Sequence, residues 1–451
     1  MASPTDLRGL PSGTASAAAR DAAELALWRM LSSFGSPLDD LDAAAAADPA
    51  WAMPHVMRAG HLLALGDPAL LPQAADALAL AGSLAAPAPA REQAHLQAVA
   101  ALLEGGWRPA CERWGVLLID SPLDALALHA AHHWDTVRGD RSALRSRPAG
   151  ALPAWSTDDP LYPHVLARWS CALAENNLFV QAEDAARLAL QCQARVPLAV
   201  IAAARAMQLQ GRFDEGSAWL RQHQDTWADD STLAVHLWWQ MALFRIEAMD
   251  LAGAQRLVDS HFVGAALHAW SQRVDAASLL WRLHLLGVDM RARFGELLAG
   301  WQPDPAQAGG HALGDLHVVL AHLGAGDLGG AERWIAGCAR RALAVEDGRC
   351  ANHRVARDVG LPLMRGMVAL ERGDAAAATA LMLPVRNLLP RLGGSQVQRE
   401  LVDLSLLRAA GRGAPPAPGR AILNERLMAM PATPLTRHWC AELGTDEEAR
   451  A

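Results

Sequence analysis

The clearest copy of a recurring turn in this chain is Gly326-Asp327-Leu328-Gly329-Gly330-Ala331. Related turns recur along most of the chain, and their recurrence indicates the fold. Each turn is followed, four or five residues after it opens, by a small residue that closes it. The closing residues stand 33 to 47 positions apart, at Ala110, Ala143, Ala182, Gly216, Ala254, Ala292, Ala331 and Ala378. Periods of this length are typical of helix-pair repeats, in which each unit buries its apolar face against its neighbours.

The residues around this turn have the spacing of two helices. Before it, apolar residues recur at i, i+3, i+4 and i+7, and the same spacing resumes after the break; these residues are Leu316, Val319, Leu320, Leu323, Ala331, Trp334, Ile335 and Cys338. The small residue that opens the second helix of each pair lets the first helix approach closely. No stretch alternates apolar and polar residues for long enough to predict a strand.

We therefore predict an all-α fold, an α-solenoid or superhelix of tetratricopeptide-like helix pairs that closes toward a toroid. Its expected parts are a flexible tail over residues 1–20, a repeat array over 21–412, and a C-terminal loop with a capping helix over 413–451, all in one domain. Loops are expected at Pro303–Gly310 and Gly411–Gly419, with the final helix beginning near Ala421.

Composition narrows the function classes. The chain has 451 residues, a net charge of -8 and a pI near 6.1, which argue against nucleic-acid binding. The six cysteines form no C-x-x-C pair, so we expect reduced, buried thiols without a zinc site. No signal peptide and no membrane-length apolar run is evident, so the sequence predicts a cytoplasmic protein without membrane contact.

Several strings resemble the tetratricopeptide repeat protein 38 family. In the C-terminal third the matching strings are Ala356–Leu363, Leu383–Arg386, Leu392–Glu400, Asn424–Arg426 and Pro434–Thr436. Upstream, in matching order, they are Arg91–His95, Ser121–Leu128, Glu175-Asn176 and Asp315-Leu316-His317. The resemblance runs from about residue 40 to residue 440 and implies a superhelix of helix pairs, with no biochemical activity to transfer.

The sequence departs from the family pattern at its histidines. In the helix before Gly211, family histidines are replaced by Ile201, Arg205 and Met207, and a glutamate by Gln208. In the next helix one histidine remains as His236, and the other is Gln240. Any metal binding or acid–base chemistry that relatives perform with these histidines is expected to be lost or altered here.

Candidate ligand-binding residues lie mainly in the C-terminal half. Arginine forks bind carboxylate or phosphate through two bonds, so Arg357, Arg386 and Arg399 are the cations expected around an anionic ligand. In the alternative, Asp358 and Glu400 neutralise these arginines in structural ion pairs. The full set of candidates is Asp315, His317, Arg357, Asp358, Arg386, Ser395, Gln398 and Arg399, with His95, His132 and His236 in second rank.

Structural roles compete with binding at several of these positions. Asp315 is expected to cap the helix that follows Gly314 or to pack as a buried polar group, and Ser395 to cap the helix after Gly393-Gly394. His129, His132 and His133 share helical spacing and could hold zinc, but no third ligand is placed by the sequence, so no metal or other cofactor is predicted.

The predicted function is binding rather than catalysis. Helical-repeat scaffolds commonly bind a protein or peptide in their concave face, and the candidate arginines would also suit a small anionic ligand. The alternative is an enzyme or metal-dependent protein whose histidine, aspartate and arginine side chains converge inside the superhelix.

Overall fold

The computed structural model describes residues 4–86, 88–263, 267–344 and 350–445. Within these ranges the regular structure is helical, and the β-structure consists of two isolated bridges, Thr5 to Pro11 and Phe34 to Ser231. The predicted all-α class is thereby confirmed. Helices that follow each other in the chain pack together in pairs, as α3 does with α4, α9 with α10 and α20 with α21.

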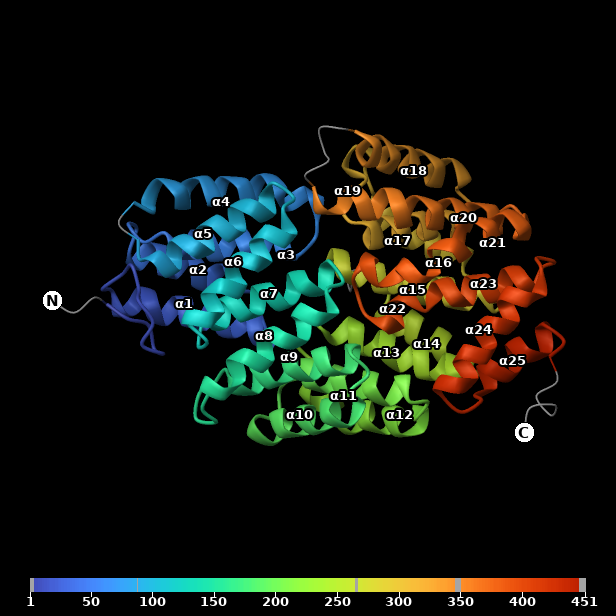
Figure 1. The fold of residues 1–451 in the computed structure, drawn as a ribbon, viewed down its shortest axis with the longest axis horizontal. Coiled ribbons are helices and arrows are strands. Elements are labelled where there is room, and N and C mark those ends of the chain that lie inside the picture. The colour runs from blue at the N-terminus through green and yellow to red at the C-terminus, as the bar shows by residue number, and fades with distance from the viewer. Residues whose placement is uncertain (1–3, 87, 264–266, 345–349, 446–451) are drawn as a thin grey trace. The chain divides into compact units, whose positions relative to one another are not determined.

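The chain divides into two compact units (Figure 1). Unit 1 comprises residues 1–203, 223–234 and 349–351. Its helices are α1 (Ala17–Ser32), α2 (Leu38–Ala47), α3 (Met53–Ala64), α4 (Leu71–Leu84), α5 (Ala90–Leu103), α6 (Trp107–Asp120), α7 (Ala125–Val137), α8 (Arg141–Ala151), α9 (Tyr162–Glu175) and α10 (Phe179–Cys192).

Unit 2 comprises residues 204–222, 235–348 and 352–451, and the first boundary between the units falls within α11 (Pro197–Leu209). Its other helices are α12 (Phe213–Gln222), α13 (Ala234–Glu247), α14 (Leu251–His261), α15 (Trp270–Leu285), α16 (Arg291–Trp301), α17 (Ala312–Gly324), α18 (Leu328–Leu343), α19 (Ala351–Val355), α20 (Leu361–Glu371), α21 (Ala375–Met382), α22 (Gln396–Arg399), α23 (Leu401–Gly411), α24 (Pro416–Ala429) and α25 (Pro434–Glu442).

The recurring turn joins the two helices of a pair with its own caps. At Gly326 the backbone is left-handed, with φ of 81°, a conformation that glycine adopts without steric cost. The next residue, Asp327, is the N-cap of α18, and its carboxylate accepts the Gly330 N–H at 2.8 Å. The same capping bond is made by Asp124, Asp140, Asp250 and Asp374.

Most of the small residues that follow the turns are buried, as close approach of the paired helices requires. Ala110, Ala182, Ala254, Ala331 and Ala378 are completely buried. At Gly216 a Cβ atom would lie 2.5 Å from the Phe244 ring, so only glycine fits there. Ala143 and Ala292 are exceptions, since Ala143 is half-buried and Ala292 is exposed at the start of α16.

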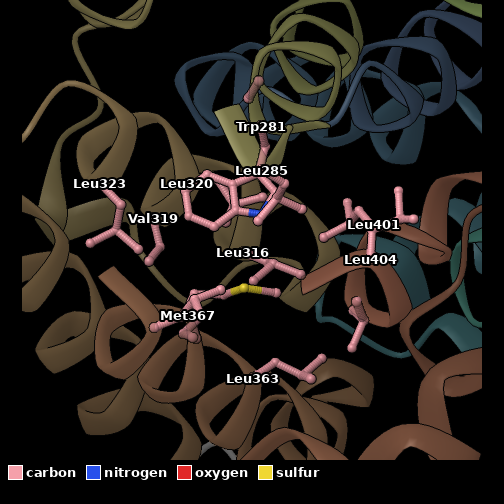
Figure 2. Packing of buried hydrophobic residues seen from close by; sticks show 14 of the residues in the cluster. Trp281, Leu285, Leu316, Val319, Leu320, Leu323, Leu363, Met367, Leu401 and Leu404 are labelled. Atoms are coloured by element: carbon pink, nitrogen blue, oxygen red, sulfur yellow. The ribbon is translucent and has the colours of Figure 1, made fainter. Parts of the chain in front are cut away.

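The core of unit 2 contains the predicted helix stripe. Leu316, Val319, Leu320 and Leu323 of α17 are all buried. Figure 2 shows them facing side chains from α15, α20 and α23, including Trp281, Leu285, Leu363, Met367, Leu401 and Leu404. One apolar stripe therefore joins helices from several successive pairs, which is how a repeat protein builds a continuous core.

Some predicted details were wrong. The helix expected from about Ala421 already begins at Pro416, because proline is accepted in the first turn of a helix, and a second helix, α25, follows it. Asp315 does not cap its helix, because α17 begins at Ala312 with His311 as N-cap. Of the cysteines, Cys111, Cys171, Cys338 and Cys440 are buried, but Cys192 is exposed.

The awkward Gly360-Leu361-Pro362 sequence lies at a π-helical turn, Ala356–Gly360, between α19 and α20. In the segment predicted as a tail, Arg8 forms ion pairs with Glu24 and Asp159 at 2.6 and 2.9 Å, and α1 begins at Ala17. The flexibility of residues 1–20 stays a prediction.

Candidate functional site: a histidine pocket in unit 1

A pocket lies between α1, α3, α5, α6 and α7 of unit 1, and we call it the histidine pocket. Its volume is about 30 Å³. A water molecule needs at least about 10–15 Å³ of such volume, so the pocket holds roughly two oxygen-sized groups. Its lining residues are Met30, Val56, Met57, Gly60, His61, Ala64, His95, Val99, Trp114, Leu126, His129, Ala130, His133 and Trp134.

His95 is held in the wall of the pocket by a complete set of hydrogen bonds. The indole N–H of Trp114 donates to His95 Nδ1 at 3.2 Å. The other ring nitrogen, Nε2, therefore carries the proton and donates to Asp124 at 3.0 Å. Asp124 also accepts from Arg91 Nε at 2.6 Å and caps α7 through the Ala127 N–H. His95 is fixed in position, with no ring nitrogen left for a ligand.

The Asp124 carboxylate is strongly stabilised in its ionised form. It is fully buried, which opposes ionisation, but the nearby His95 and Arg91 outweigh burial and hold the pKa of Asp124 well below its usual range. Both partners lie in the string Arg91–His95 and pack against the start of α7. This network therefore fixes α5 to α7 beside the pocket.

His129 has a different environment, because its partner is a buried cation. Arg168 of α9 donates from Nη2 to His129 Nδ1 at 2.6 Å. A ring nitrogen that accepts a bond from a guanidinium cannot carry a proton, so the proton of His129 is on Nε2. No described residue accepts a hydrogen bond from Nε2, and His129 lines the pocket. Its N–H is therefore a donor available to a bound group.

Arg168 forms no ion pair with any carboxylate in the described part of the chain. Only 5% of the residue is exposed, and its remaining hydrogen bonds go to the backbone oxygens of Leu31 and His164 at 3.3 and 3.0 Å. Burial lowers the pKa of Arg168 to about 10, so the group still carries its charge at neutral pH. A buried charge without a counter-ion is costly, and such charges are normally paired.

The imidazoles around Arg168 are neutral at pH 7. Burial, followed by the Arg168 cation, holds the pKa of His129 well below its usual range. Burial and the nearby Arg58 lower the pKa of His61 to about 4, and burial and Arg168 lower that of His164 to about 3. These three imidazoles therefore add no positive charge to that of Arg168.

The residues predicted as binding candidates fall in both units. His95 and His132 belong to unit 1, and of these only His95 lines the histidine pocket. The predicted helical grouping of His129 and His133 is met, because both line the pocket from α7. The remaining candidates belong to unit 2 and are spread over several local clusters.

Asp315 and His317 are buried in α17. The Asp315 carboxylate accepts the Gly309 N–H at 2.9 Å and the Trp334 indole N–H at 3.1 Å, so it packs as a buried polar group. Burial raises the pKa of Asp315 to about 6. His317 donates from Nδ1 to the Leu313 oxygen at 2.7 Å, and burial lowers its pKa to about 4.

The predicted cations of unit 2 already have partners. The exposed Arg357 pairs with Asp358 at 2.8 Å. Arg386 holds Asp403 through two bonds of 2.6 and 3.0 Å, and Glu425 at 2.7 Å. The Arg357–Asp358 pair is one that the sequence left open, whereas Arg386 has other partners than predicted and Glu400 pairs with Arg426. A ligand role for the arginines stays a prediction.

Ser395, Gln398 and Arg399 form one local cluster at the start of α22. Ser395 accepts the Gln398 N–H at 3.2 Å while Gln398 accepts the Ser395 N–H at 2.9 Å, which is a capping box. The predicted cap at Ser395 is confirmed. Arg399 is buried and donates to the oxygens of Gly393 and Gly394 at 2.9 and 2.7 Å.

His236 belongs to a second polar cluster, inside unit 2. Its Nδ1 lies 2.9 Å from the Asp275 carboxylate, and its ring stacks on Trp239 at 5.0 Å. The Arg282 guanidinium lies 5.6 Å from the Trp239 ring and also interacts electrostatically with His317. Two predicted candidates, His236 and His317, are thus linked through a buried arginine.

Sequence reasoning missed His61, His164 and Arg168. Arg168 stands in the apolar run of α9, where all residues from Pro163 to Ala174 except Trp169 are buried. A charged residue in such a run is a signal that the sequence offered, because an arginine is rarely buried without a special role. Nothing in the sequence indicates that α3, α7 and α9 bring these residues together.

No protein-family model matches this chain. In the described residues, no group of three or more His, Cys, Asp or Glu side chains is arranged to hold a metal ion. Across residues 4–86, 88–263, 267–344 and 350–445, no helix has the length and apolarity required to cross a membrane.

Proposed function

We propose that this protein is a tetratricopeptide-like helical-repeat scaffold of the cytoplasm that binds a small anionic ligand in the histidine pocket of unit 1. The observation that carries this proposal is Arg168, a buried guanidinium that has no carboxylate partner among the described residues and is bonded to His129 in the pocket wall. The resemblance to the tetratricopeptide repeat protein 38 family and a superhelical arrangement of the helix pairs are part of the same proposal.

The arrangement of Arg168 and His129 favours binding rather than catalysis. Arg168 polarises the His129 ring through Nδ1, which strengthens Nε2–H as a donor to an anion. The neutral His61 lines the same pocket, and no described residue is hydrogen-bonded to its imidazole ring. Among the described residues that line the pocket there is no serine, threonine or cysteine, so these residues offer no hydroxyl or thiol nucleophile for covalent chemistry.

The proposal is tested by titrating the purified protein with acetate, benzoate, sulfate and inorganic phosphate while calorimetry and thermal unfolding are followed. We expect at least one anion to bind, and His129→Gln to weaken that binding by about tenfold, the loss of one charge-assisted bond. The matched control is His55→Gln, because His55 lies on α3 outside the lining. Absence of binding by all four anions would contradict the proposal.

A second candidate function is acid–base chemistry at the His236–Asp275 pair of unit 2. The bond from His236 Nδ1 to Asp275 leaves Nε2 as the basic nitrogen, and 16% of the His236 side chain is exposed. This is the enzyme alternative, with histidine, aspartate and arginine in one cluster. Binding of a protein or peptide partner is the third possibility, and a pull-down with the His129→Gln and His236→Gln variants separates the two sites.

A further inference from the structure

We infer that the ligand of the histidine pocket is a monocarboxylate with an apolar body. Its carboxylate enters the pocket at His129, and its apolar part follows the wall toward the rim. This inference rests on the proposed function and adds the chemical class of the ligand, which is selected by the size of the pocket, its single charge and its apolar lining.

The size of the pocket suits a carboxylate. A volume of about 30 Å³ accommodates roughly two oxygen-sized groups, when each needs at least about 10–15 Å³. A carboxylate presents two oxygens, whereas phosphate and sulfate present four in a tetrahedron. The larger anions would have to displace side chains from α3 or α7.

The charge of the site suits a monoanion. Arg168 reaches the wall through its bond to His129 and has no carboxylate partner in the described part of the chain. His95 contributes no charge, because both of its ring nitrogens are used by Trp114 and Asp124. Arg91 is paired with Asp124, and Arg58, which lies near His61, is paired with Asp42. Neither arginine therefore supplies the second uncompensated positive charge that a phosphate dianion would require.

The remaining wall suits an apolar chain. Met30, Val56, Met57, Val99 and Leu126 line the pocket, and all five are buried. Two of them are methionines, whose flexible side chains adapt to ligands of different shape.

The rim of the pocket leaves room for the body of the ligand. Gly60, Ala64 and Ala130 line the pocket and are partly exposed, and none has a side chain larger than a methyl group. A chain that leaves the pocket between α3 and α7 would pass over these small residues. Replacing one of them with a large side chain should therefore obstruct the body of the ligand and spare its carboxylate.

The test is calorimetric titration of the full chain with acetate, butanoate, hexanoate and inorganic phosphate. We expect the dissociation constant to fall by about fourfold for each methylene buried, with phosphate weaker than hexanoate. Ala130→Leu should weaken hexanoate by about tenfold or more and leave acetate unchanged, since it fills the rim and leaves the donor in place. His129→Gln should weaken every carboxylate, and His55→Gln none.

The outcomes separate the inference from the proposed function. Phosphate binding that exceeds hexanoate binding and is lost in His129→Gln would overturn the inference and keep the anion site. Affinity independent of chain length, or an Ala130→Leu variant that binds hexanoate normally, would also overturn it. If no anion binds while the circular dichroism and thermal unfolding of the protein are normal, the proposed function fails as well.

Discussion

Arg168 in unit 1 and Arg282 in unit 2 occupy similar positions but have different surroundings. Each is buried in a long helix and donates from Nη1 to the backbone oxygen four residues earlier, Arg168 at 3.0 Å and Arg282 at 3.2 Å. Burial lowers the pKa of both guanidinium groups to about 10. Around Arg282, however, three carboxylates raise the pKa and favour the charged form, namely Glu400, Asp275 and Glu247.

The groups that surround each arginine distinguish a structural cation from a candidate binding cation. Arg282 also holds Ser278 and the Val397 oxygen, so α15 and α22 are joined by it in a region where nearby carboxylates compensate its charge. Arg168 has imidazoles and backbone oxygens as partners, with a pocket beyond His129. Carboxylates of unit 2 therefore compensate the charge of Arg282, whereas a bound anion would be needed to compensate the charge of Arg168.

The largest loss of stability is expected at the buried ion pairs of Arg426 in unit 2. Arg426 is buried and bonds Glu247 and Glu400, and Glu247 is also held by Thr433 at 2.8 Å. Arg426→Met leaves Glu247 buried without its cation, and we expect a loss of about 3–5 kcal/mol in the free energy of unfolding. Denaturant titration measures the loss, and hydrogen exchange should place it in unit 2. Unchanged stability would show that Glu247 is neutral in the folded protein.

The next effect compares one buried carboxyl group from each unit. In the folded protein the pKa of Asp315 is raised from its ordinary value of 3.8 to about 6. Protonated Asp315 therefore contributes fully to the free energy of unfolding below pH about 3.8, and this contribution is lost as the pH rises through about 6. Asp315→Asn keeps the acceptor for the Gly309 N–H without the charge. The quantity to compare is the free energy of unfolding of Asp315→Asn minus that of the natural protein. We expect this difference to rise by up to about 3 kcal/mol as the pH is raised from about 4 to about 8.

Asp124 provides the control with the opposite sign. Its pKa is held well below the usual range, so its contribution is present above the unfolded value and is lost as the pH falls. Asp124→Asn should therefore be more destabilising at pH 7 than at pH 3, in denaturant titrations at both values. If both substitutions changed stability by an amount independent of pH, the assigned directions of the two pKa shifts would be wrong.

The smallest effect is the difference between the two buried arginines. Arg168→Met removes three hydrogen bonds but also an uncompensated charge, so we expect a change within about 1–2 kcal/mol. Arg282→Met removes the cation that compensates nearby carboxylates. We expect its loss in the free energy of unfolding to be about 1–2 kcal/mol larger than that of Arg168→Met. Thermal and denaturant unfolding of the two variants measure the difference. A larger cost for Arg168→Met would mean that Arg168 is chiefly structural.

The helix pairs could be predicted from the sequence because the information is local. Glycine with a left-handed backbone, the capping aspartate and the buried alanine all lie within a few residues, as at Gly326, Asp327 and Ala331. The start of α24 was missed by five residues because Pro416 and Pro418 indicate a loop, yet prolines are accepted in the first turn of a helix.

The site was less predictable because it depends on contacts between distant segments. The i, i+4 spacing of His129 and His133 indicated a shared face, and the structure places both at the pocket. The partner of His129 lies 39 residues further along the chain, and only the packing of α9 brings it there. In unit 2, Arg386 was chosen by residue type, and it lies beside Asp403, whose proximity the sequence does not reveal.

The Gly–Asp turn also has a consequence for how the chain folds. The bond from the Gly330 N–H to Asp327 spans three residues, and the bond from the Asp327 N–H to the His322 oxygen spans five. Closing such short loops costs little chain entropy, and proteins rich in local contacts fold fast. Each turn is therefore a nucleation point available as soon as its helix pair leaves the ribosome, before the later pairs have been synthesised.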